Sequence, residues 1–354
     1  MKIPKHMKAA ILWECGKPLL IEDNVEVPEL MSGQVLIKMA YSGVCRSQLM
    51  EVSGQRGEDK YLPHLLGHEG SGKVVSIAPD VTKVSVGDWA ILGWIKGDGL
   101  NVAGAKYKLG DKIINSGAVT TFSTYTIVSE NRVVPLPSGL PKDISVLFGC
   151  ALPTGAGIIL NQVKPKKESS IAFIGLGGIG LSGLMATKAF ECKNIIAVDV
   201  SDEKLALAIE FGATHTIKAS DSDVLKEIYN ITNGVGVDYS VEAAGEVETI
   251  ELAFESVRNS GGQCIFASHP EAGKNISIDP FSLISGKNIK GSWGGSSNPD
   301  IDIPILANLY KYGKMPLQRL VTKKYSLDEI NIALSDLKKS NVFRPLIVID
   351  ESLS

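Results

Sequence analysis

A glycine-rich turn between a buried strand and a helix constrains this chain more than any other feature. The apolar segment SSIAFI at residues 169–174 is typical of a buried strand, GLGGIG follows at 175–180, and an apolar helix pattern continues from there. Strand and helix patterns then alternate through six strands, to about residue 293. This alternation predicts an α/β region with an open, mostly parallel, doubly wound sheet.

The turn has the G-x-G-x-x-G pattern of a dinucleotide-binding site. Its first glycine allows the tight turn, the second lets the backbone approach a pyrophosphate, and the third lets helix and strand pack closely. The start of the following helix then offers N–H donors and a favourable dipole to the phosphates. The predicted cofactor contacts in this turn are Gly175, Gly177, Gly178, Ile179 and Gly180.

Asp199 indicates which dinucleotide is bound. It ends the next strand pattern, 19 residues after Gly180. A carboxylate at this place accepts hydrogen bonds from a free adenosine ribose and repels a 2′-phosphate. Val200 and Ser201 follow, so no arginine stands there to bind a phosphate. We therefore predict NAD rather than NADP; the alternative is that Asp199 only caps a strand end.

The two ends of the chain have a different pattern. Residues 1 to about 140 contain short apolar or alternating segments separated by turn residues, which is typical of β-structure. A less regular insert at about 96–117 is predicted as a loop with glycine hinges. After about 294, two helix patterns and the strand pattern RPLIVID are expected to return to the first domain. The predicted domains are 1–151 with 294–354, and 152–293.

The composition argues against several other classes of protein. The chain has 354 residues and a net charge of −3, and no basic stripe indicates a nucleic-acid or membrane partner. Two uncharged runs, 144–163 and 171–187, contain proline, amides or several glycines and are not predicted to span a membrane. The five cysteines are scattered, and the N-terminus lacks an apolar signal segment. We expect a cytoplasmic globular protein.

The segment LGHEGSG at residues 66–72 suggests a metal site, because it places His68 beside Glu69 among glycines. Cys45 and Cys150 are the other candidate ligands. Two thiolates and one imidazole suit Zn²⁺ and leave its fourth position open for water or substrate. The alternative is a turn histidine and two small buried thiols. Because these residues lie far apart in sequence, their spacing does not decide between a metal site and structural side chains.

The motifs, taken in order, resemble those of the medium-chain, zinc-dependent alcohol dehydrogenases. GVCRS, GHEGSG and GCALPTG match the three ligand motifs of that family, GLGGIG with Asp199 matches its cofactor motif, and SGKNIKGSWGG and FRPLIV match near the end. The resemblance covers nearly the whole chain. It implies a GroES-like catalytic domain and a Rossmann domain, an alcohol or carbonyl substrate, and a homodimer or homotetramer.

The resemblance also implies roles for single residues. Cys45, His68 and Cys150 would hold the catalytic zinc, with Glu69 close behind and able to visit the metal. Ser47 would take the alcohol proton. The implied cofactor contacts outside the glycine turn are Arg46, Thr154, Lys204 and Arg344. Trp94 and Phe122 fall on the substrate pocket or pack in the core. His64, which follows Pro63, is expected in a loop and not as a ligand.

Three departures from the family pattern affect the expected chemistry. The region matching the structural-zinc lobe, 96–117, has no cysteine, so we predict one zinc per chain and no structural zinc. Gln48 replaces the acid that orients the zinc-bound histidine, and should raise His68 basicity less. Met50 replaces a relay histidine and carries no proton. The missing lobe favours a substrate larger than ethanol, such as a polyol.

The predicted function is hydride transfer between an alcohol and NAD. Two alternatives remain at this point. One is a zinc-free quinone or enoyl reductase of the same superfamily, which would lack the full ligand set. The other is a non-catalytic NAD-binding protein.

Overall fold

The chain folds into two compact units. The computed structural model describes residues 3–353. One unit holds the chain up to Cys150, Asn298–Lys311 and the segment from Leu317 onward, and the other holds Ala151–Ser297 with Tyr312–Pro316. The first unit's N-terminal segment ends at Cys150, where we predicted 151, and the second unit's main segment ends at Ser297, where we predicted a return to the first domain at 294. Tyr312–Pro316 also lies in the second unit.

Two β-sheets form the frame of the first unit. Alternating apolar residues and Gly/Pro turns make these short strands, as the sequence indicates. The smaller sheet has the order β4 (His64–Leu65), β1 (His6–Leu12), β2 (Leu20–Glu26), β7 (Tyr107–Leu109), β8 (Lys112–Ile114). The larger has the order β10 (Val133–Pro135), β6 (Trp89–Gly93), β5 (Glu69–Ile77), β3 (Gln34–Gly43), β18 (Pro345–Val348), β17 (Lys323–Ser326), with β9 (Tyr125–Ser129) also on β3.

The segment 96–117 is not the plain loop that we predicted. It contains an antiparallel hairpin in which β7 pairs with β8, with Leu109 opposite Lys112. The sequence pattern does not reveal these two strands, because each has only three residues and each contains a lysine. The turn between them contains Gly110 at φ +56°. The hairpin extends the smaller sheet through a contact of β7 with β2.

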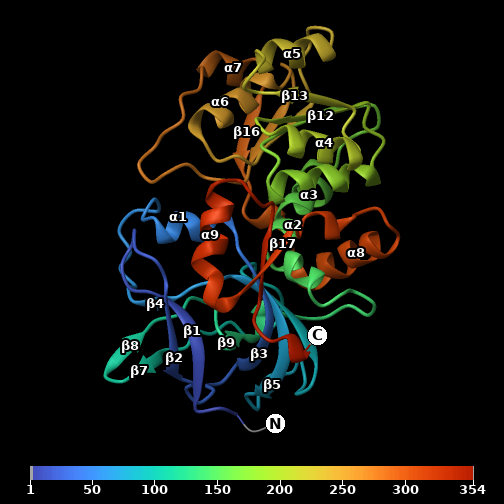
Figure 1. Cartoon of the computed structure of the whole chain (residues 1–354). Coiled ribbons are helices and arrows are strands. Elements are labelled where there is room, and N and C mark those ends of the chain that lie inside the picture. Colours follow the sequence, from blue (N-terminus) through green and yellow to red (C-terminus); the bar gives the residue numbers. More distant parts are fainter. Residues whose placement is uncertain (1–2, 354) are drawn as a thin grey trace. The chain divides into compact units, whose positions relative to one another are not determined.

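Helices and the C-terminal strand complete the first unit. The helices are α1 (Arg46–Val52), α8 (Pro299–Lys311) and α9 (Ile330–Lys338) (Figure 1). The C-terminal strand β18 pairs antiparallel with β3. The apolar face of α9 enters a core cluster that also holds Phe122, which is 1% exposed. Phe122 is therefore a core residue and not a pocket wall. The chain returns to its first unit, as the RPLIVID pattern indicates.

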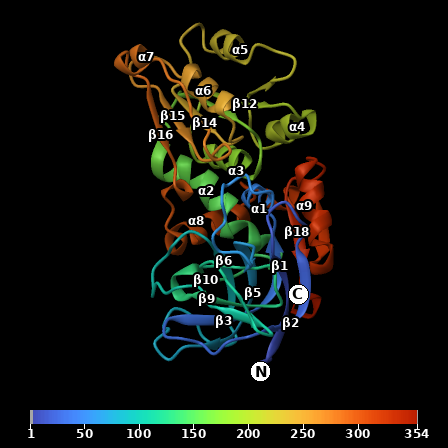
Figure 2. The same ribbon diagram turned by 90° about the vertical axis from the view of Figure 1, so that its left-hand side faces the viewer.

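The second unit contains the predicted doubly wound sheet. Its strands are all parallel, in the order β13 (His215–Lys218), β12 (Asn194–Asp199), β11 (Ser170–Ile174), β14 (Tyr239–Glu242), β15 (Gln263–Phe266), β16 (Asn288–Gly291). Winding reverses between β11 and β14, so right-handed crossovers place α3 and α4 on one face and α6 on the other (Figure 2). The helices are α2 (Ala151–Gly157), α3 (Gly178–Ala186), α4 (Asp202–Glu210), α5 (Val224–Ile231), α6 (Val247–Ser256) and α7 (Pro280–Ile284).

The two uncharged runs belong to these folded units. The first forms two short irregular helices around α2, and the second forms β11 and α3. Across residues 3–353, no helix combines the length and the apolar character that crossing a membrane requires.

Candidate active site

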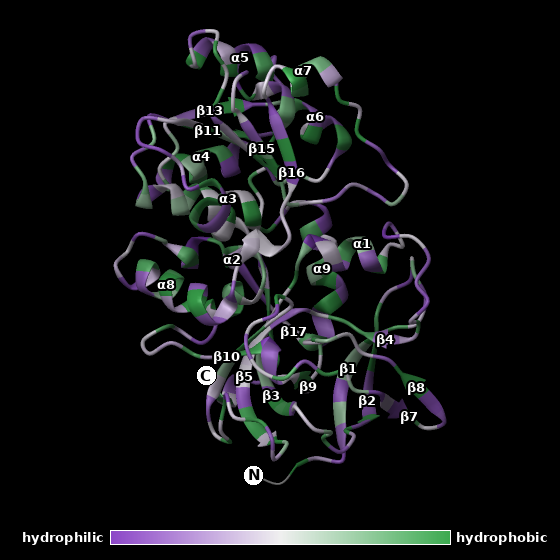
Figure 3. Cartoon of the chain, turned by 180° about the vertical axis from the view of Figure 1, so that it is seen from behind, coloured by the Kyte–Doolittle hydropathy of each residue, from purple (hydrophilic) through white to green (hydrophobic). Residues whose placement is uncertain are grey.

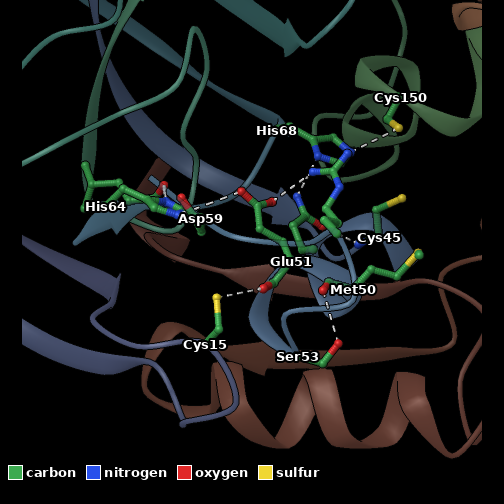
Figure 4. A network of polar contacts seen from close by, with 12 residues as sticks. Cys15, Cys45, Met50, Glu51, Ser53, Asp59, His64, His68 and Cys150 are labelled. Atoms are coloured by element: carbon green, nitrogen blue, oxygen red, sulfur yellow. Dashed lines mark hydrogen bonds and ion pairs between the residues drawn. The ribbon is translucent and has the colours of Figure 1, made fainter. Parts of the chain in front are cut away.

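Three side chains with soft or borderline donor atoms meet in the first unit. Cys45 directly precedes α1, and His68 lies between β4 and β5. Cys150 is the last residue of the first unit's N-terminal segment. Their ligand atoms all lie within 4.8 Å of one another, and His68 Nε2 is 3.2 Å from Cys150 Sγ. Figure 4 shows the His68 ring directed at the Cys150 sulfur. The structure therefore brings together the three residues that the motifs singled out.

Glycines let the backbone pass close to this cluster. Gly67 has φ +91°, a left-handed conformation, and a Cβ there would collide with Thr121. A Cβ on Gly149 would collide with a backbone oxygen of β6 and with Glu69. The glycines in LGHEG and FGCAL are thus required by packing around His68 and Cys150.

Gln48 controls the orientation of the His68 ring. Its side chain is 1% exposed, its Oε1 accepts a hydrogen bond from Cys45 N at 2.6 Å, and its Nε2 lies 3.0 Å from His68 Nδ1. An amide that donates to Nδ1 leaves the proton of a neutral imidazole on Nε2, the nitrogen that faces the thiols. A metal needs the lone pair of that nitrogen, so metal binding requires the His68 proton to move to Nδ1 and the Gln48 amide to turn its oxygen toward that proton.

The two cysteines hold their protons unequally. A hydrogen bond from Cys150, with further help from His68 and Arg344, holds the pKa of the Cys45 thiol well below its ordinary value. The hydrogen bond to Cys45 and burial raise the pKa of Cys150 well above its ordinary value. In the hydrogen bond between them, the Cys150 thiol is therefore the donor and the Cys45 sulfur the acceptor. Metal binding must release the Cys150 proton.

Glu69 and Arg344 form a buried ion pair beside the cluster. Glu69 is 0% exposed, and Arg344 Nη2 donates to its Oε1. Burial raises the pKa of Glu69, although the Arg344 charge opposes this. Breaking such a pair leaves an uncompensated buried charge and costs about 3–5 kcal/mol. The sequence did not suggest this pairing, because the partners are 275 positions apart.

Two buried oxygen atoms near the cluster have no hydrogen-bond partner among the described residues, Ser47 Oγ and Glu69 Oε2. Such atoms are costly unless a ligand uses them. A donor set of two cysteines and one histidine, with unpaired oxygens beside it, fits Zn²⁺ with an open fourth position. These residues are therefore suited to hold zinc and a hydroxyl-bearing substrate.

The glycine turn of the second unit has the geometry of a phosphate cradle. Gly175, at φ +90°, follows β11, and a Cβ on Gly180 would collide with the Gly175 carbonyl. A Cβ on Gly177 would meet nothing within 4 Å, so the backbone there faces open space at the start of α3. Gly178 and Ile179 form the first turn of α3. This arrangement leaves room for a pyrophosphate against backbone N–H groups.

Asp199 lies where β12 ends and is 8% exposed. Its Oδ2 accepts from Leu176 N at 2.7 Å, its Oδ1 accepts from Ser201 N at 3.0 Å, and Lys204 Nζ lies 3.5 Å from Oδ2. These bonds hold the carboxylate beside the glycine turn, and each oxygen retains a lone pair for a ribose hydroxyl. Asp199 therefore links the end of β12 to the glycine turn and to the start of α4.

The other residues that the sequence assigns to cofactor or substrate lie at defined positions within their own units. Arg46 is exposed on α1, Thr154 is buried on α2, and Trp94 is half-buried after β6. Arg344 faces Glu69 in this structure. His64, which the sequence predicts in a loop, is instead buried in β4 and lies beside two carboxylates.

Comparisons with known proteins agree with this architecture. A model of the alcohol dehydrogenase GroES-like domain matches residues 31–138, and a zinc-binding dehydrogenase model matches 178–309. S-(hydroxymethyl)glutathione dehydrogenase of Komagataella pastoris is 32% identical over 371 positions, with 97% of each chain covered. The same-named protein of Paracoccus denitrificans is 32% identical over 92% of this chain and 94% of its own. The solved benzyl alcohol dehydrogenase of Acinetobacter calcoaceticus superposes with a TM-score of 0.89 at 31% identity, with 98% and 100% covered.

Two folded domains with this ligand cluster and this glycine turn define an oxidoreductase of the alcohol dehydrogenase class. The chain belongs to the medium-chain, zinc-dependent alcohol dehydrogenase family.

Proposed function

We propose that this chain is an NAD-dependent, zinc-dependent alcohol dehydrogenase that interconverts an alcohol and its aldehyde or ketone. The observation that carries the proposal is the meeting of Cys45, His68 and Cys150 in the first unit. The open backbone at Gly177 beside Asp199 supports a dinucleotide in the second unit. We assign the first unit to the zinc site and the second to NAD.

The protein's own residues would position the reactants. Bound zinc supplies a Lewis acid that lowers the pKa of a bound hydroxyl, as it lowers that of water from 15.7 to about 7. Ser47 Oγ, buried and unpaired, would accept the alcohol proton. Met50 cannot carry that proton further, so it must leave through water or a ribose hydroxyl. Glu69 would stay beside the metal as the partner of Arg344.

The remaining cofactor contacts are proposed on charge and position. Asp199 and Lys204 would bind the adenosine ribose, Arg46 and Arg344 the pyrophosphate, and Thr154 would pack near the nicotinamide. NAD supplies the hydride acceptor, and the protein fixes its geometry. For the substrate we propose an alcohol larger than ethanol, because segment 96–117 lacks the cysteines of a structural-zinc lobe. A substrate panel with ethanol as the best substrate would overturn that choice.

Elemental analysis of the dialysed protein tests the core of the proposal. We expect one tightly held zinc per chain, none bound in segment 96–117, and loss of both zinc and NAD-dependent turnover in Cys45→Ser. Metal-free protein that is active, and that added zinc does not stimulate, would instead be a zinc-free reductase. Tight NAD binding without turnover on any alcohol would indicate a non-catalytic protein.

Self-association and location are proposed on weaker grounds. The outer edge of the parallel sheet, β16, pairs only with β15 in the described sheet, and α7 beside it exposes 71% of Phe281 and 80% of Ile284 (Figure 3). Unpaired edges and exposed apolar groups favour pairing with a second copy, as in a homodimer or homotetramer. The described cysteines are all free thiols, which fits the reducing cytoplasm. Light scattering of Phe281→Asp, expected to give monomers, tests the interface.

A further inference from the structure

A second set of potential metal ligands lies at the far end of α1. Glu51 is in the last turn of α1, Asp59 is in the loop that follows, and His64 begins β4. One ligand atom from each lies within 4.8 Å of the other two. His64 Nε2 is 2.8 Å from Asp59 Oδ2 and 4.0 Å from Glu51 Oε1 (Figure 4).

A neutral His64 cannot satisfy all of the acceptors that its ring faces. The residue is 6% exposed, and its Nδ1 lies 2.9 Å from the Leu65 carbonyl oxygen, which can only accept. Nδ1 must therefore carry a proton, and a neutral imidazole then has a bare lone pair on Nε2. That lone pair faces two carboxylates, which are also acceptors. The cluster needs either a second proton on His64 or a metal ion between the three side chains.

The His64 contacts match the outer arrangement of metal-binding histidines. In such sites, the nitrogen away from the metal typically donates to a backbone carbonyl or carboxylate, and this fixes the ring and its tautomer. Asp59 is also held in place, because its Oδ1 accepts from Tyr61 N at 2.9 Å and leaves Oδ2 directed at His64. A chance group of exposed acids would have neither support.

We propose that His64, Asp59 and Glu51 form a second binding site for a divalent cation of the zinc class, separate from the cysteine site. One imidazole and two carboxylates suit Zn²⁺ or Co²⁺, with water completing the shell. Ligand atoms around tetrahedral Zn²⁺ lie about 3.4 Å apart, so the distances of 2.8 Å and 4.0 Å from His64 Nε2 to the two carboxylates each need to change by about 0.6 Å. The two carboxylate charges would balance the ion.

The charges around the cluster favour a cation. Burial raises the pKa of the neighbouring Cys15 thiol, and the carboxylates of Asp59 and Glu51 raise it further. Apart from His64, Arg56 is a counter-ion of these acids: its Nη1 lies 3.4 Å from Glu51 Oε2, and its side chain is 45% exposed. An exposed pair of this kind contributes little.

Occupancy would join α1, the following loop and β4. Cys45 directly precedes α1, and His68 follows β4, so both segments adjoin ligands of the cysteine site. The second ion would therefore stabilise the segments that present two of the three zinc ligands. The inference does not depend on the proposed function, since it concerns a different donor set. Without thiolates, this site should bind more weakly than the cysteine site.

Cobalt titration of the metal-depleted full chain separates the two sites. Cobalt bound by Cys45 and Cys150 shows a strong thiolate-to-metal charge-transfer band, whereas cobalt bound by His64, Asp59 and Glu51 has only weak bands. We expect two cobalt ions per chain at equilibrium dialysis. D59N and E51Q should each weaken the band-free ion at least tenfold and keep the charge-transfer band. E58Q, which neutralises the exposed acid next to Asp59, is the matched control and should keep both ions.

Other results would overturn the proposal. A wild type that binds one cobalt, with the charge-transfer band, would show that His64 is a protonated partner of the acids. A second ion that persists in D59N and E51Q would bind elsewhere. If one variant also loses the band, its first unit has not folded, and the other variant decides. A missing band in the wild type would count against the cysteine site and not against this one.

Discussion

At the scale of single residues, Gln48 is the departure with the clearest chemical consequence. A carboxylate at this position would accept a hydrogen bond from His68 Nδ1–H and so present the Nε2 lone pair to a metal. The Gln48 amide instead donates to Nδ1, because its oxygen is already used by Cys45 N. The chain therefore stabilises the histidine tautomer that metal binding must undo.

Gln48→Glu should tighten zinc binding. The glutamate keeps the length of the side chain and can accept from both Cys45 N and His68 Nδ1. Changes in such supporting contacts typically alter metal affinity by about 10–100-fold. Competition with a chromogenic chelator measures the change, and Gln55→Glu in the next loop controls for added charge. Equal affinities in the wild type and Gln48→Glu would contradict this account of the tautomer.

Asp199 should determine the choice between NAD and NADP. Asp199→Ala with Val200→Arg removes the carboxylate and adds a cation for the 2′-phosphate. A hydrogen bond to a charged group contributes about 1.5–3 kcal/mol, so NAD affinity should fall about tenfold or more while NADP affinity rises. Calorimetric titration of both dinucleotides checks this. A wild type that already prefers NADP would show that Asp199 does not read the ribose.

At the scale of elements, Glu130 connects segment 96–117 to the loop that follows β5. It is 2% exposed; its Oε1 accepts from Thr82 N at 2.7 Å and Lys83 N at 2.8 Å, and its Oε2 accepts from Leu100 N at 2.8 Å. One buried carboxylate therefore ties two loops together through backbone N–H groups. No metal is needed for this connection.

Glu130→Gln should destabilise the first unit. An amide N–H₂ group would face a backbone N–H, and leaving a buried group unpaired costs about 1–3 kcal/mol. Burial alone would raise the pKa of Glu130, but the three backbone donors outweigh it and lower the pKa. The carboxylate contribution is thus present at neutral pH and is lost as pH falls through the lowered pKa. In thermal unfolding, the difference in melting temperature between Glu130→Gln and the wild type should become smaller in acid. Glu29→Gln, at an exposed position, is the control.

The sequence predicts some elements better than others, for identifiable reasons. The alternation after residue 165 involves local periodicity, and it correctly indicated the parallel sheet and the place of Asp199. Cys45, His68 and Cys150 come from distant segments, so only their match to a family pattern joined them. The β7–β8 hairpin and the Glu69–Arg344 pair depend on tertiary contacts that no local pattern records. Pro63 led us to expect His64 in a loop, whereas the structure places it buried in β4.

At the scale of the whole molecule, each unit has its own core and its own proposed ligand. Metal and dinucleotide should therefore leave separate local signatures. Chelation should increase hydrogen exchange in 45–52 and 64–70, whereas NAD should decrease it in 175–180 and 199–204. At about 100 times its Kd, NAD should add roughly 2.7 kcal/mol to the unit that binds it. Mass spectrometry resolves these peptides, and NAD protection confined to 45–52 would contradict the assignment of the units.

The pairing of β18 with β3 also has a consequence for synthesis on the ribosome. Cys45, His68 and Cys150 all leave the exit tunnel before Arg344 and the strand that follows it. Until then, the larger sheet lacks an inner strand and Glu69 lacks its counter-ion. The second unit, continuous in sequence for nearly all of its length, can fold while the nascent chain is still growing. The residues proposed to hold the metal are therefore translated in the first half of the chain, but their surroundings are completed only near its end.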